Sequence, residues 1–170
     1  VSRGYSDSDL WDIYSFLQKL IPDMLERYKD TKHGSPSHLG QNVTNEDGFL
    51  DNLTCHEEWD KILDQMIFLW RESDEDTCTQ KNEYEEDHEK AFLEFTDTYG
   101  VLGEKLQTEK EIQEGKKYNY RTVHFMSEIP KYKEIDRKYM DREDELRKYR
   151  IECKDKAMDM LKQYFFDLWD

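Results

Sequence analysis

The sequence predicts an all-α protein: a helical bundle with an outlying charged helical hairpin. Two observations lead to this prediction. Apolar residues recur at the i, i+3, i+4 spacing of an amphipathic helix over much of the 170 residues. Hydrophobic residues make up only 36% of the chain and charged residues 38%, so each helix should have one buried stripe and one charged face. No flexible linker or repeat divides the chain, and we expect a single domain over residues 1–170.

The first core helix is expected at residues 9–29, where the apolar positions keep helical spacing. Asp7 or Ser8 can cap its N-terminus. Pro22 lies within the pattern and, because it lacks an N–H group, is expected to kink the helix. Gly34, Pro36 and Gly40 then end the helix and open a loop.

Residues 54–71, as a second helix, and residues 150–170, as the end of a long last helix, supply the remaining apolar faces of the expected core. The second helix should begin at Thr54, because Thr54 and Glu57 have the spacing of a capping box. The last helix should start near Pro130, which suits a first helical turn, and run to the end of the sequence. Four tryptophans are expected to pack in this core as large anchors: Trp11, Trp59, Trp70 and Trp169.

The charged middle of the chain, residues 73–150, is expected to form the outlying expansion. Residues 71–115 contain 15 acidic residues against 5 basic ones and offer few apolar anchors. Residues 80–99 still keep a helical stripe. Residues 116–126 alternate apolar and polar side chains as a strand does, which leaves a short β-hairpin open there.

The net charge of −15 disfavours several classes of partner. A negative field of this size repels nucleic acid and phospholipid headgroups, so neither direct nucleic-acid binding nor membrane association is expected. No apolar run approaches the roughly 20 residues that span a bilayer. Three widely separated cysteines suit reduced thiols better than a disulfide framework. These features together predict a cytoplasmic protein.

The patterns for metal or catalytic chemistry are incomplete. Glu85 and His88 have the spacing of half a di-iron bundle site, but the second copy that such a site needs is missing. His56 and Glu57 are followed by Asp60 where the helix of a zinc protease has its second histidine. Without a complete nucleophile, base or phosphate-binding loop, we expect no enzyme activity, no metal and no cofactor.

Two sets of residues are candidates for binding. The polar groups beside the aromatic anchors either form hydrogen bonds in the core or converge with the rings on a pocket for a small nucleotide. The acidic residues of the charged middle are either a solubilising surface or an interface for a basic or nucleic-acid-binding protein. The first set is Trp11, Asp12, His33, Trp59 and Asp60, and the second is Glu83, Glu85, Glu86 and Glu89.

Three parts of the chain carry a further signal. They are RGYSDSDLWD at residues 3–12 with HGSP at 33–36, EWDKILDQMI at residues 58–67, and YFFDLWD at residues 164–170. Together they resemble an uncharacterised family of short acidic helical proteins that tailed phages and prophages encode. Residues 73–150 depart from the compact pattern of that family. The resemblance implies a phage accessory protein in the cytoplasm of the host cell.

Charge and resemblance lead to one functional hypothesis and one alternative. The hypothesis is a non-enzymatic phage protein that binds a host or phage protein through an acidic helical surface, for example to inhibit host defence. The alternative is a sequestering protein that captures a small nucleotide signal in an aromatic-lined pocket.

Overall fold

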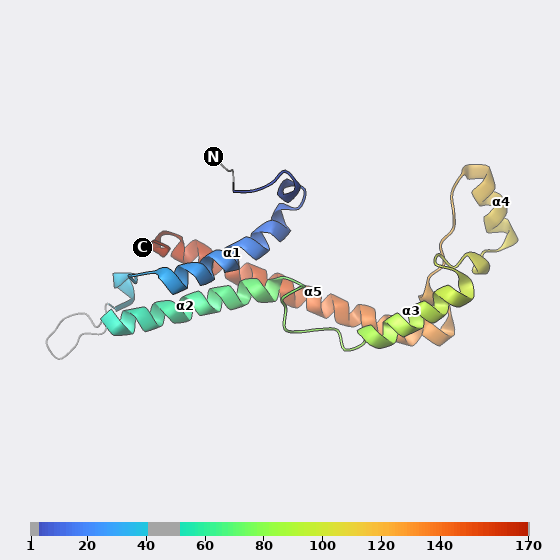
Figure 1. Cartoon of the computed structure of the whole chain (residues 1–170). Helices are drawn as coiled ribbons and strands as arrows, with labels where there is room; N and C mark the ends of the chain where they lie inside the picture. The colour runs from blue at the N-terminus through green and yellow to red at the C-terminus, as the bar shows by residue number, and fades with distance from the viewer. Residues whose placement is uncertain (1–3, 41–51, 170) are drawn as a thin grey trace. The chain divides into compact units, whose positions relative to one another are not determined.

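The computed structural model describes residues 4–40 and 52–169, and in these residues the chain is all-α with no strand. The fold class predicted from helical periodicity is therefore confirmed. The helices are α1 (Ile13–Thr31), α2 (Asn52–Ser73), α3 (Glu85–Tyr99), α4 (Glu109–Tyr118) and α5 (Pro130–Tyr164) (Figure 1). Short 3-10 turns lie at Ser8–Leu10, Ser37–Gly40, Glu104–Leu106, Met126–Glu128 and Phe165–Asp167.

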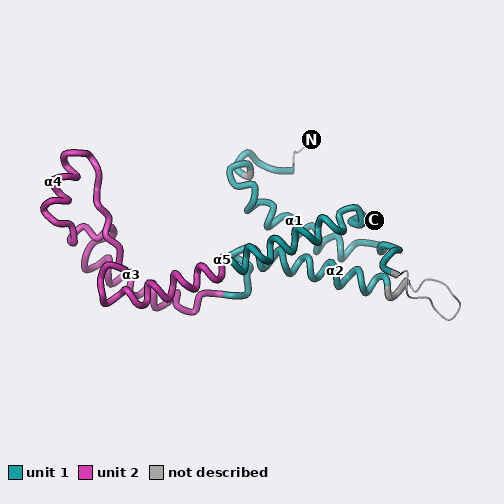
Figure 2. The backbone as a smooth tube through the Cα atoms, turned by 180° about the vertical axis from the view of Figure 1, so that it is seen from behind, with its two compact units in different colours: residues 1–80, 148–170 teal, residues 81–147 magenta. Residues whose placement is uncertain are grey.

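The chain divides into two compact units (Figure 2). Unit 1 contains residues 1–80 and 148–170, and unit 2 contains residues 81–147. Helix α5 contributes its first half to unit 2 and its second half to unit 1. The helices expected to form the core fall in unit 1, and most of the expected charged expansion falls in unit 2.

Unit 1 places α1, α2 and the second half of α5 around one apolar core. Trp59 is its largest fully buried side chain, and its ring meets Tyr164 edge-on with the centroids 5.6 Å apart. This contact ties α2 to the end of α5. The buried core residues are Leu25 from α1, Trp59, Leu63, Met66, Leu69 and Trp70 from α2, and Cys153 and Ala157 from α5.

Polar contacts fix an antiparallel register between α1 and α2. The Nζ atom of Lys32, just after α1, lies 2.8 Å from Oδ1 of Asp60 in the first half of α2. At the other end, Gln18 Nε2 donates to the carbonyl oxygen of Ser73, the last residue of α2, over 3.0 Å. The residues of α1 before Gln18 therefore extend past the end of α2.

Two helix starts differ from the sequence predictions. Helix α1 begins at Ile13, because the Asp12 carboxylate accepts hydrogen bonds from the backbone N–H and the hydroxyl of Ser15, at 3.5 and 2.7 Å. The caps predicted further upstream are therefore wrong. Helix α2 begins at Asn52, two residues before the predicted start. Helix α1 continues through Pro22, which is buried.

Unit 2 has a smaller core of its own. Its buried residues are Phe95 from α3, Met126 from the 3-10 turn before α5, and Tyr132 from α5. The rings of Phe95 and Tyr132 meet edge-on with centroids 6.1 Å apart. Helix α4 adds no buried residue to this core.

Residues 116–126 contain no strand, so the β-hairpin left open there is wrong. Helix α4 occupies the first part of this range, and Asn119 ends it in the left-handed conformation at φ 56°. The rest is irregular and is joined to the preceding segment by a backbone hydrogen bond from His124 N to Leu102 O at 3.1 Å. A hairpin would need a ladder of such bonds between two strands.

Candidate functional site

The four tryptophans predicted as core anchors divide into two buried and two exposed residues. Trp59 and Trp70 are 0% and 3% exposed, whereas Trp11 is 92% and Trp169 61% exposed. The prediction is thus confirmed for α2 and wrong for the other two. Trp11 lies just before α1, on the turn that precedes the helix. Trp169 follows the last helical turn.

The first set of predicted binding residues does not line one pocket. Asp12 caps α1, and Asp60 takes part in the ion pair that fixes the register of α1 and α2. His33 is exposed in the segment after α1. Trp11 is almost fully exposed and Trp59 is fully buried, so the structure does not bring these two rings to one surface.

The second set, Glu83, Glu85, Glu86 and Glu89, lies at the start of unit 2, and all four residues are exposed. Glu83 accepts a hydrogen bond from Arg142 Nε at 3.0 Å. Glu86 lies 3.9 Å from Lys90 Nζ on the same helix. Glu85 and Glu86 stand in the first turn of α3, where the helix dipole favours acidic groups. Basic residues within unit 2 therefore offset part of this acidic face.

An apolar patch at the N-terminal end of α1 is a feature that the sequence analysis missed. Ile13 and Leu17 lie one turn apart on α1, and Tyr14 is the residue after Ile13. The apolar stripe of α1 is longer than the stripe of α2 that faces it, and this excess is the signal that could have revealed the patch. We call these five exposed residues the α1 patch: Leu10, Trp11, Ile13, Tyr14 and Leu17, at 52, 92, 52, 70 and 40% exposure.

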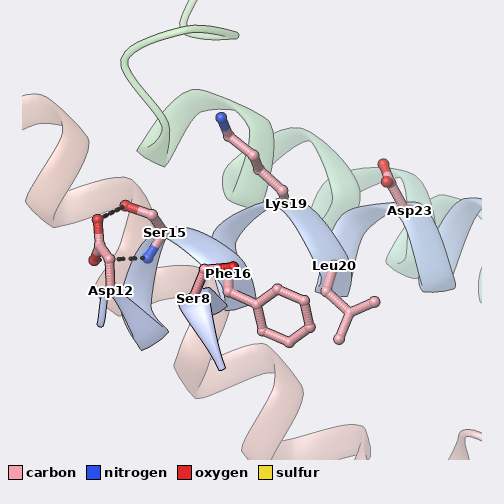
Figure 3. A pocket seen from close by; sticks show the side chains of 7 residues that line it. All are labelled: Ser8, Asp12, Ser15, Phe16, Lys19, Leu20 and Asp23. Carbon is pink, nitrogen blue, oxygen red and sulfur yellow. Dashed lines mark hydrogen bonds between the residues drawn. The ribbon is translucent and has the colours of Figure 1, made fainter. Parts of the chain in front are cut away.

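An open hollow of about 410 Å³ lies along the same part of α1, and its lining residues are different from those of the α1 patch (Figure 3). Phe16 and Leu20 point to one side of the helix and give the hollow an apolar wall, while Lys19 and Asp23 point to the other side. Lys19 Nζ is bonded to Asp76 Oδ2 at 3.0 Å. An apolar surface with a charged rim is typical of protein interfaces.

Unit 1 also contains a buried carboxylate. Glu72 is 1% exposed and accepts hydrogen bonds from the Tyr149 hydroxyl at 2.8 Å, the Thr79 backbone N–H at 2.9 Å and the Thr79 hydroxyl at 3.0 Å. Burial raises the pKa of Glu72, but these bonds outweigh it and hold the pKa below its ordinary value. Burial also raises the pKa of the neighbouring Cys78 thiol. The cluster joins the end of α2 to α5 and has a structural role.

Several kinds of site do not occur in the part of the chain that the structure describes. No group of three or more histidine, cysteine, aspartate or glutamate residues is placed there to hold a metal ion. No helix in residues 4–40 or 52–169 combines the length and apolar character that crossing a bilayer requires. Cys55, Cys78 and Cys153 are free and buried.

No protein-family model, curated protein or solved structure matches the chain. The resemblance to phage proteins therefore stays a prediction. The stretches that carry it all belong to unit 1, whereas unit 2 falls within residues 73–150, where the chain departs from the family pattern.

Proposed function

We propose that this chain is a non-enzymatic binding protein that contacts another protein through the α1 patch. The 92% exposure of Trp11, among four further exposed apolar side chains, carries the proposal. Soluble proteins seldom leave large apolar side chains grouped in water, and such patches mark interaction sites. Tryptophan and tyrosine, which the patch contains, are enriched among the residues that dominate binding energy.

The charge of unit 1 indicates a basic partner. Residues 1–80 and 148–170 contain 22 acidic and 12 basic residues. A partner with apolar residues surrounded by lysine and arginine would cover the patch and be attracted by this charge. A second copy of the chain would bring the same negative charge and be repelled. The acidic face of unit 2, with Glu83, Glu85, Glu86 and Glu89, adds long-range attraction for the same basic partner.

The resemblance supports a more specific proposal about the setting. A phage accessory protein would act in the host cytoplasm on a host or phage protein, such as a component of host defence. Trp11 and Trp169 lie in the first and last of the resembling stretches and are both exposed. Their exposure agrees better with a binding role for these stretches than with core packing.

Capture from extracts of infected host cells tests the proposal. The wild-type chain is compared with a patch variant, Trp11→Ser with Tyr14→Ser, and with a control, Leu93→Ser with Tyr118→Ser. The control residues are 56% and 62% exposed and lie in unit 2, so both variants remove exposed apolar area. A fourth chain replaces the four glutamates of the acidic face with glutamine.

We expect a protein that the wild type and the control retain and that the patch variant loses by about tenfold or more, the loss typical of hot-spot residues. The glutamine variant should bind the same protein more slowly, mainly at low ionic strength. Equal capture by wild type and patch variant would overturn the proposal. Loss in the glutamine variant alone would move the interface to unit 2.

A further inference from the structure

Unit 2 contains an apolar hollow of about 400 Å³ that the proposed function does not use. Its walls come from α3, from residues 101–102 and 123–127, and from the first half of α5. We call it the unit 2 pocket. Its volume falls within the range of about 300–1,000 Å³ in which small molecules bind.

The rim of the unit 2 pocket is apolar and exposed. Phe92, Val101, Phe125 and Met140 all line it, and their side chains are 43, 69, 63 and 54% exposed. Apolar residues this exposed are usually scattered singly over a surface. Here four of them surround one hollow, so an occupant with an apolar body would remove them from water together.

The floor of the pocket is held in place before any ligand binds. Phe95 and Met126 line it and are 1% and 5% exposed. The backbone bond between His124 and Leu102 joins two of its walls. Gly103, at φ +65°, permits this approach, because a Cβ atom there would lie 2.7 Å from His124 Cβ. A preformed cavity binds at a lower conformational cost than one that must open.

Two histidines and Asp136 are the titratable residues that line the pocket, and Glu111 and Glu128 contact His124 without lining it. His88 Nε2 lies 3.1 Å from Oδ1 of Asp136, which also lines the pocket. His124 Nδ1 lies 2.8 Å from Glu128 Oε2, and its Nε2 lies 3.5 Å from Glu111 Oε1. The hydrogen bond to Glu128 raises the pKa of His124, so this histidine holds its positive charge more firmly.

The charges around the pocket favour a cation. Behind the pocket wall, Glu111 and Glu128 bring two negative charges against the one positive charge of protonated His124, and Asp136 adds a carboxylate to the lining itself. In the described residues, no lysine or arginine lines the pocket. Phe92, Phe95 and Phe125 line the pocket, and aromatic rings attract cations. A phosphate or carboxylate ligand would meet repulsion at the same place.

We propose that the unit 2 pocket binds a small organic cation, with an apolar body against Phe92 and Phe125 and a protonated amine near Asp136. The proposal does not depend on the α1 patch, which belongs to unit 1. Binding a small molecule here would be a second activity of the chain.

Tryptamine and indole-3-propionate test the proposal, because they share an apolar body and carry opposite charges. Each compound is titrated into the full-length ¹⁵N-labelled protein, and amide chemical shifts are followed. We expect tryptamine to saturate shifts at the lining residues with a millimolar or lower dissociation constant, and the acid to bind about tenfold more weakly or not at all. No saturable shift with tryptamine, or equal binding of both compounds, would overturn the proposal.

Adjacent positions on α3 provide a matched pair of variants. Phe92 lines the pocket and Leu93 does not, and both are partly exposed, so neither change should unfold unit 2. Phe92→Ala should weaken tryptamine binding about fivefold or more, and Leu93→Ala should leave it unchanged. Asp136→Asn should reduce the preference for the amine over the acid. Equal effects of Phe92→Ala and Leu93→Ala would place the binding outside the pocket.

Discussion

Glu72 connects the stability of unit 1 to pH. A carboxylate removed from water is tolerated only where its oxygens accept hydrogen bonds. Glu72 Oε1 accepts from the Thr79 N–H, and Oε2 accepts from the hydroxyls of Thr79 and Tyr149. These donors favour the ionised carboxylate over the protonated acid. Because burial opposes ionisation and the donors outweigh it, the folded chain binds the Glu72 proton less tightly than the unfolded chain does.

Glu72→Gln should therefore lower the free energy of unfolding at neutral pH and make that free energy depend less on pH in the acid range. The pKa of Glu72 is lowered in the folded chain, so its contribution is complete above the unfolded value of about 4.3 and is lost as pH falls through the folded value. At pH 7 the variant should lose about 1–3 kcal/mol, because an amide cannot accept from all three donors. Below pH about 4 the difference should shrink. Urea unfolding at several pH values measures both effects.

Glu57→Gln is the matched control, because Glu57 is an exposed glutamate on the same helix. It should change neither the stability at neutral pH nor its fall in acid. If the difference between wild type and Glu72→Gln stays constant from neutral to acid pH, the Glu72 carboxylate does not carry the pH dependence assigned to it.

Replacement by alanine should lower the free energy of unfolding much more at Trp59 than at Trp11. Trp59 is fully buried against Tyr164, so Trp59→Ala leaves a cavity and should cost about 3–5 kcal/mol. Trp11 is 92% exposed, so Trp11→Ala should change stability by no more than about 0.5 kcal/mol. Chemical unfolding followed by circular dichroism compares the two. A large loss for Trp11→Ala would mean that the α1 patch is packed against the chain itself.

At the scale of helices, the boundaries that could be predicted have a strong local signal. Pro130 is the first residue of α5, and Gly100 caps the end of α3, as proline and glycine predict. The start of α1 could not be fixed in the same way. Asp7, Ser8 and Asp12 are all good caps, and the local sequence does not rank them.

Helix α4 cannot be predicted from apolar periodicity. None of its residues is buried, so it has no continuous stripe. Its N-terminus is held by a capping box, in which the Thr108 hydroxyl accepts from Glu111 N at 3.3 Å and Glu111 Oε2 accepts from Thr108 N at 2.7 Å. Thr108 and Glu111 have the same capping-box spacing as Thr54 and Glu57, and this spacing is the sequence signal for the start of α4.

Thr108→Ala should therefore destabilise α4 selectively. The loss of an N-cap side chain costs about 0.5–2 kcal/mol, and no core contact compensates for it in this helix. Amide hydrogen exchange in residues 109–118 should become faster, while exchange in α2 should not change. Gln113→Ala, at an exposed position within α4, is the control and should slow exchange or leave it as it is. Unchanged exchange in Thr108→Ala would show that the cap does not hold the helix.

The candidate site could be predicted from the sequence only in part. Trp11 and Asp12 are candidate binding residues from the sequence, because a large aromatic ring stands beside a carboxylate. The sequence could not give their roles, because the exposure of Trp11 depends on where α2 ends relative to α1. That register rests on contacts such as Gln18 with Ser73, 55 positions apart, which no local pattern contains.

At the scale of the whole molecule, the charged middle of the chain has a hydrophobic core of its own. Phe95, Met126 and Tyr132 come from three separate segments and form the second core. No periodicity links such residues, so the sequence indicated a charged expansion without indicating its core. Helix α5 is the element that both units share.

Two separate cores should give two separable stabilities. Phe95→Ala removes the least exposed side chain of the unit 2 core and should cost its protected amides about 3–5 kcal/mol of protection against hydrogen exchange. Leu63→Ala is the mirror change in unit 1 and should affect the amides of α1 and α2. Each substitution should leave the slowest-exchanging amides of the other unit unchanged, because the two buried clusters share no residue.

Helix α5 reports on both units. The amides of its second half should lose protection in Leu63→Ala, and those of its first half should lose protection in Phe95→Ala. Equal loss of protection in both units after either substitution would instead mean that the chain unfolds as one cooperative domain, with α5 coupling the cores.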